Sequence, residues 1–169
     1  MRKTRKLTLM ALIVSQALVL HYIESFIPVL APGAKLGLAN IMTMVTLVLF
    51  GFREAVLVVI IRSVLGPLLG GSITGIVYSL SGGILSGIIM SILYLKFETY
   101  FSLMGISTAG AVFHNIGQLL TASWIFGSIG ILYTYLPVLM LAAIITGNFN
   151  GLVTHYILGY LKDRLRQGG

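Results

Sequence analysis

Residues 73–95 read ITGIVYSLSGGILSGIIMSILYL, and this segment contains no charged residue. About 20 predominantly apolar residues are needed for a helix to cross the hydrocarbon layer of a membrane. A soluble helix would also carry a charged face toward water, which this segment lacks. The segment therefore predicts a transmembrane helix, with which the other apolar runs of the chain are compared.

Similar apolar runs, separated by Gly, Pro or charged residues, occur on both sides of this segment. They predict five further helices, near residues 7–28, 36–50, 53–69, 103–126 and 132–160. The second and third runs are short for complete spans, so we expect one of them to be bent, re-entrant or shielded by its neighbours. The fold class expected is all-α, a polytopic bundle of about six transmembrane helices.

The composition supports a membrane protein and excludes several soluble classes. Hydrophobic residues make up 57% of the 169 residues and charged residues only 9%, whereas globular domains carry about 25% charged residues. We expect one integral membrane domain over residues 1–169, with basic tails at 1–6 and 161–169. Absence of cysteine excludes disulfides and thiolate chemistry. The net charge of +7 follows from membrane topology, so no nucleic-acid partner is expected.

The basic residues also predict the orientation in the cytoplasmic membrane. With the amino terminus inside and six passes, both termini are cytoplasmic, and Lys35 is the one basic residue in an outer segment. Nine basic residues then fall in inner segments, in accordance with the positive-inside rule: Arg2, Lys3, Arg5, Lys6, Arg53, Lys96, Lys162, Arg164 and Arg166.

Small residues recur at helical spacing, which allows helix backbones to approach closely in lipid. Gly75, Ser79, Gly83 and Gly87 form one such stripe, and Gly147 and Gly151 form another. Packing within the chain and contact with a partner both explain these stripes. Ala11 and Ser15 form a similar pair on the first helix.

Ionisable residues at membrane depth are costly and usually face a bundle interior or an aqueous cavity. Four residues meet that description, Arg62, His21, Glu24 and His114, and polar residues accompany them. We expect a substrate-binding pocket in the outer half of the bundle, in which Arg62, helped by Lys35 and His114, receives an anionic or strongly polar small molecule. The complete predicted set is Glu24, Lys35, Asn40, Arg62, Tyr78, His114, Asn115 and Gln118.

Structural explanations compete with this one. Glu24 and Arg62 would neutralise each other as a buried pair that fixes helix register. His114, Asn115 and Gln118 would form interhelical hydrogen bonds. His114 and Gln118 are four residues apart and so share a helix face.

The chain lacks the residues of several catalytic classes. It has no G-x-x-x-x-G-K-[ST] phosphate loop, and its histidines and acidic residues have no spacing typical of a metal site. We expect no enzyme activity, no cofactor and no metal. An uptake role would need another polypeptide or an ion gradient for energy.

Three segments resemble the Gx transporter family, often labelled heptaprenyl diphosphate synthase component I. They are PGAKLGLANI at 32–41, FGFREA at 50–55 and GAVFHNIGQL at 110–119, and the likeness extends from about Leu7 to Tyr160. The family is in turn similar to the S components of energy-coupling factor transporters, which are bundles of about six helices that capture a vitamin-like molecule.

The resemblance implies a membrane substrate-binding or transport subunit for a small organic molecule. It further implies a membrane coupling protein and ABC-type ATPases as partners, contacted through Ala11 and Ser15. The synthase label implies an alternative, a non-catalytic membrane partner of a prenyl synthase or redox protein in isoprenoid, quinone or membrane redox metabolism. Prenyl elongation needs clustered carboxylates for Mg²⁺, and the chain has one aspartate, Asp163. An ion-coupled carrier dependent on Glu24 is a third alternative.

Overall fold

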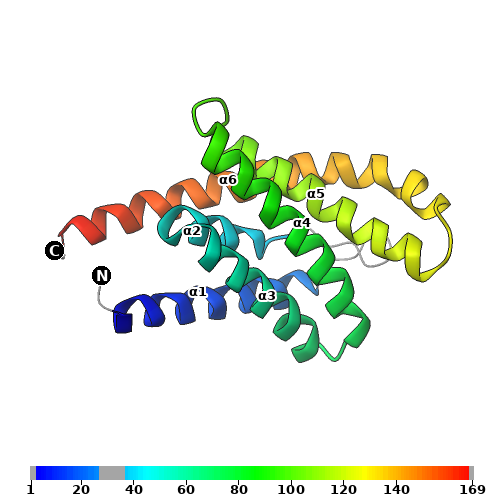
Figure 1. The fold of residues 1–169 in the computed structure, drawn as a ribbon, viewed down its shortest axis with the longest axis horizontal. Coiled ribbons are helices and arrows are strands. Elements are labelled where there is room, and N and C mark those ends of the chain that lie inside the picture. Colours follow the sequence, from blue (N-terminus) through cyan, green and yellow to red (C-terminus); the bar gives the residue numbers. More distant parts are fainter. Residues whose placement is uncertain (1–2, 27–36, 168–169) are drawn as a thin grey trace.

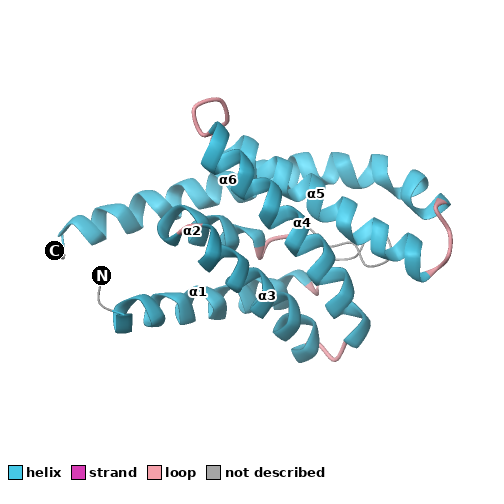
Figure 2. Cartoon of the chain, viewed as in Figure 1, coloured by secondary structure: helices cyan, strands magenta, loops and turns pink. Residues whose placement is uncertain are grey.

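The computed structural model describes residues 3–26 and 37–167, with side chains as far as Leu161. Within them lie six helices and no strand (Figures 1 and 2). The helices are α1 (Lys3–Glu24), α2 (Asn40–Phe50), α3 (Phe52–Leu69), α4 (Ile73–Phe97), α5 (Leu103–Ile125) and α6 (Gly130–Gln167). The prediction of an all-α bundle is confirmed, and the predicted helices match these six in order and, within a few residues, at most of their ends.

Three of the described helices are long and apolar enough to cross a membrane: α1, α4 and residues 130–161 of α6. The chain is thus a membrane protein. The beginning of α1 and the end of α6 lie at the same end of the bundle (Figure 1). Helix α6 has 38 residues, which corresponds to about 57 Å at 1.5 Å per residue. It is therefore longer than a hydrocarbon layer of about 30 Å. The basic tail predicted from residue 161 is part of this helix as far as Gln167.

Helix α2 is the short, central element. Its 11 residues give it a length of about 16 Å, roughly half of the hydrocarbon layer. Every residue from Asn40 to Leu47 is buried, and α2 contacts each of the other five helices. The sequence prediction that one short helix is shielded by its neighbours is confirmed for α2.

The apolar core forms around α2. Helix α1 buries Met10, Ile13 and Ala17, which are three or four residues apart and so lie on one face. This face packs with Ile41, Met42 and Val45 of α2. On the other side of α2, Met44 and Leu47 pack with residues of α3, α4 and α5.

Glycines set the close crossings of the last three helices. A methyl group built on Gly117 of α5 would come within 2.8 Å of the carbonyl oxygen of Ser81 on α4, and one on Gly147 of α6 within 2.4 Å of Cα of Thr108 on α5. On α4, Gly83 lies against Val59 and Ser63 of α3. Gly83 and Gly147, one from each of the two glycine stripes, therefore serve packing inside this chain.

Candidate functional site

Gly37 lies at the meeting point of three helices and their polar side chains. Its backbone N–H donates to Oε1 of Glu24, at the end of α1, and its carbonyl oxygen accepts from Nδ2 of Asn150 on α6 at 3.2 Å. The backbone φ of Gly37 is +77°, a conformation that favours glycine. Gly37 thus connects α1 to α6 just before α2 begins.

Arg62 on α3 supplies the positive charge of this region. Its side chain is 1% exposed. Nη2 donates to Oδ1 of Asn40 at 2.5 Å, and Nε donates to Oγ1 of Thr43 at 3.2 Å. Both acceptors are neutral and lie on the first turn of α2, so the guanidinium joins α3 to α2 through the neutral oxygens of Asn40 and Thr43.

Glu24 is buried in the same region, and its carboxylate interacts electrostatically with Arg62. The hydrogen bonds of the guanidinium, however, go to Asn40 and Thr43, while the carboxylate accepts from the backbone of Gly37. The two groups hence contribute opposite charges to one site, and the guanidinium donates to neutral oxygens of α2.

His114 and Gln118 of α5 lie beside this region, across the glycines of α4. A methyl group on Gly82 would come within 3.0 Å of Nδ1 of His114 and 2.9 Å of Cγ of Gln118. One on Gly37 would lie 3.7 Å from Cδ2 of His114. The prediction that His114 and Gln118 share a helix face is therefore confirmed: both contact Gly82, and His114 also lies near Gly37.

Seven buried residues from all helices except α4, together with Gly37, make up what we name the Gly37 cluster. Its members are Glu24, Gly37, Asn40, Thr43, Arg62, His114, Gln118 and Asn150. Two of its polar atoms, Nδ2 of Asn40 and Oδ1 of Asn150, have no hydrogen-bond partner among the described residues. A bound group is able to satisfy both of these buried atoms by hydrogen bonding.

Residues 13–157 match the family described as heptaprenyl diphosphate synthase component I. The chain belongs to this family. No curated protein and no solved structure matches it. The match covers every member of the Gly37 cluster, so the cluster is part of the region that defines a component I chain.

Of the eight predicted substrate-binding residues, five belong to the Gly37 cluster: Glu24, Asn40, Arg62, His114 and Gln118. Asn115 points elsewhere, because its Nδ2 donates to the carbonyl oxygen of Leu139 on α6 at 3.0 Å. Tyr78 is half-buried on α4, one turn before Gly82. Lys35 lies outside the described residues.

Sequence reasoning missed three members of the cluster. Thr43 is flanked by methionines within an apolar helix, Asn150 lies far along the chain on α6, and Gly37 acts through its backbone. A polar residue inside an apolar run was the available signal for Thr43 and Asn150. No signal in one sequence pairs residues 37 and 150, which are distant along the chain.

The pair predicted to contact a partner lies away from this cluster. Ala11 and Ser15 are exposed on α1, opposite the face that packs into the core, and Oγ of Ser15 donates to the carbonyl oxygen of Ala11 at 2.9 Å. These two small residues are therefore exposed to the surroundings of the single chain.

Proposed function

We propose that this component I chain is a non-catalytic membrane subunit that binds a small organic molecule and serves its uptake, as S components do. The observation that carries the proposal is the burial of Arg62 among polar groups of several helices inside a membrane bundle. Burying a guanidinium is costly, and intramembrane charges commonly mark substrate pathways. The proposed ligand site is the Gly37 cluster.

The chemistry of the cluster favours an anionic or strongly polar ligand. Arg62 carries a positive charge, and Nδ2 of Asn40 is an unsatisfied donor beside it. Oδ1 of Asn150 adds one unsatisfied acceptor. In addition, the amino end of α2 lies within the bundle, and the partial positive charge of a helix amino terminus favours an anion. These donors and this charge support a ligand with an acidic or carbonyl-rich end.

The basic residues support an orientation in which both termini are cytoplasmic, in the cell membrane with six passes. Uptake needs an energy source, and the chain has no phosphate loop of its own. A membrane coupling protein with ABC-type ATPases would provide it. Such a protein would pack on the exposed small residues Ala11 and Ser15, since small residues allow close helix contact in lipid.

Proteins that co-purify with the tagged chain test this function directly. The chain is extracted gently from its native membrane at natural abundance, and its partners and small-molecule contents are identified by mass spectrometry. We expect a coupling protein and ABC-type ATPases, with a polar metabolite in the extract. Recovery of a prenyl synthase or a redox protein in their place would contradict the transport role.

Variants then test the site. Arg62→Ala and His114→Ala should each lose the co-purifying metabolite, and Arg62→Lys should keep part of it, because the lysine retains the charge but not the forked donor geometry. Asn148→Ala, at an exposed position on α6, is the matched control and should retain the metabolite. Unchanged retention in both Arg62→Ala and His114→Ala would exclude these residues as the site.

The family description favours a second candidate, a non-catalytic membrane partner in isoprenoid, quinone or membrane redox metabolism. The high apolar content of the chain, which would accommodate a lipid-like ligand, supports this second candidate. Deletion of the protein should then change prenyl chain length or quinone content. An unchanged lipid and quinone profile, measured beside the wild-type strain, would leave transport as the single proposal.

A further inference from the structure

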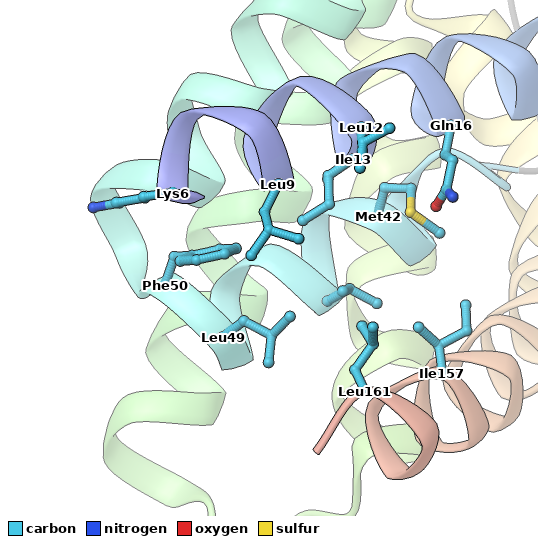
Figure 3. Close-up of a pocket in the computed structure, with 11 residues that line it drawn as sticks. Lys6, Leu9, Leu12, Ile13, Gln16, Met42, Leu49, Phe50, Ile157 and Leu161 are labelled. Carbon is cyan, nitrogen blue, oxygen red and sulfur yellow. The ribbon is translucent and has the colours of Figure 1, made fainter. Parts of the chain in front are cut away.

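A cavity of about 430 Å³ lies between α1 and α6, and no member of the Gly37 cluster lines it (Figure 3). Helix α2 forms its floor. Figure 3 shows the side chains of Leu9, Ile13, Met42, Leu49 and Ile157 pointing into it. We name it the α1–α6 groove; its lining is Lys6, Leu9, Leu12, Ile13, Gln16, Met42, Val45, Leu49, Phe50, Ile157 and Leu161.

The groove exists because α1 and α6 both pack on α2 while their own backbones stay apart. In the described part of the chain, no Cα atom of α1 comes within 8 Å of one of α6, whereas both helices contact α2. Nine of the eleven lining residues are hydrophobic, the exceptions being Lys6 and Gln16. In a membrane, a recess of this kind opens sideways to the hydrocarbon of the bilayer.

One end of the groove is strongly basic. Lys6 lines the groove at the first turns of α1, where Lys3 and Arg5 are exposed. Leu161 lines it on α6, and the sequence continues from there with Lys162, Asp163, Arg164, Leu165 and Arg166. Both helices that wall the groove therefore carry basic residues at the same end. Glu54, paired with Lys6, and Asp163 offset only part of this charge.

We propose that the α1–α6 groove binds one hydrocarbon chain of an anionic phospholipid, with the lipid phosphate at the basic beginning of α1, near Lys3, Arg5 and Lys6. The apolar walls match the chain, and the basic end matches the phosphate. Basic pockets between transmembrane helices bind anionic lipid headgroups in this way. The site is new with respect to the Gly37 cluster and needs none of its residues.

The combination of apolar walls and a basic end favours an anionic lipid over a helix of a partner protein. An anionic lipid carries an apolar chain and a phosphate at one end, whereas a membrane-spanning helix is predominantly apolar along its length. A flexible chain a few ångströms wide is able to follow the groove along its length.

Native mass spectrometry of the purified chain tests the proposal, with phosphatidylglycerol and phosphatidylcholine of equal chain length as probes. Leu9→Trp adds bulk inside the groove. Leu7→Trp makes the same helix larger at a position that is 70% exposed and outside the lining. We expect Leu9→Trp to lower phosphatidylglycerol retention about tenfold, as loss of roughly one buried side chain's contact area does, and Leu7→Trp to retain it. Equal retention by the two variants would overturn the groove as the site.

The headgroup is tested with variants that leave the groove walls intact. The double variant K3Q/R5Q removes two exposed charges, and Lys96→Gln, at the exposed end of α4, is the control. Because each basic residue near a membrane surface contributes about a fivefold gain in anionic-lipid binding, K3Q/R5Q should lose most of the preference for phosphatidylglycerol, whereas Lys96→Gln keeps it.

Two results would overturn the assignment of the occupant. One is equal retention of phosphatidylglycerol and phosphatidylcholine by the wild-type chain. The other is displacement of phosphatidylglycerol by an equimolar polyprenyl diphosphate, which would assign the groove to an isoprenoid instead. Because K3Q/R5Q changes only exposed positions, its result is informative even if Leu9→Trp does not fold.

Discussion

Arg62 of α3 donates from Nη2 to Oδ1 of Asn40 on the first turn of α2, at 2.5 Å. This bond fixes the orientation of the Asn40 amide, because Oδ1 must face the guanidinium and Nδ2 is then turned away from it. Nδ2 lies next to Gly37, since a methyl group built there would come within 2.8 Å of it. One buried charge on α3 thus determines which atom of α2 faces the Gly37 turn.

The first prediction concerns the stability that this bond provides. Asn40→Ala should lower the free energy of unfolding by about 1.5–3 kcal/mol, because a buried hydrogen bond to a charged group is lost and the guanidinium remains. Thermal unfolding in detergent measures the change. Asn148→Ala, on the exposed side of α6, is the control and should change the stability little. Equal melting of both variants would contradict a structural role for Asn40.

Much of the fold was predictable from the order of apolar runs. The absence of charge over residues 73–95 predicted α4, which spans Ile73–Phe97. The short run at 36–50 predicted a shielded helix and corresponds to α2, whose amino end lies in the bundle interior. The apolar runs predict where the helices lie, and the length of a run predicts shielding, because a helix too short to cross the hydrocarbon layer must be covered by its neighbours.

The candidate site was predictable only in part. Arg62, Glu24 and His114 stood out because charge and imidazole are costly at membrane depth. Their partners did not stand out, since Thr43 is small and Asn150 is remote in sequence. Asn115 was grouped with His114 because it is adjacent in sequence, yet adjacent residues on a helix point about 100° apart, and its amide bonds to α6 instead.

The second prediction concerns the crossing of α5 and α6. Gly147→Ala should destabilise the protein by about 1–3 kcal/mol, because the new methyl group meets the backbone of Thr108 at 2.4 Å and the helices must separate. Gly159→Ala on the same helix is the matched control, since a methyl group there meets nothing within 4 Å. That variant should be neutral or stabilised by up to about 1 kcal/mol, because alanine favours helix. Thermal unfolding measures both variants, and equal melting temperatures would contradict the packing role of Gly147.

The third prediction concerns the bond from Gly37 to Glu24. Glu24→Ala should speed hydrogen exchange of the Gly37 amide by about 10- to 100-fold, the range that corresponds to loss of a charge-assisted hydrogen bond. Glu24→Gln keeps an acceptor oxygen and should show a smaller increase. Hydrogen–deuterium exchange followed by mass spectrometry of the peptide that contains Gly37 measures the exchange rate. Glu98→Ala, at an exposed residue after α4, should leave exchange unchanged; an equal rate in Glu24→Ala would contradict the bond.

The fourth prediction separates a partner surface from a packing surface on α1. Ala11 and Ser15 are exposed, and the buried face of α1 lies on the opposite side. Ala11→Leu and Ser15→Leu should therefore leave thermal stability within about 0.5 kcal/mol of wild type.

The same two variants should reduce recovery of the coupling protein about tenfold, because leucine prevents the close helix approach that small residues allow. Thr134→Leu makes a comparable change at an exposed position of α6 and should leave recovery unchanged. Stability and recovery respond to different faces of the same helix, so the pair of measurements distinguishes misfolding from a lost contact. Full recovery with both α1 variants would show that a partner meets another face of the bundle.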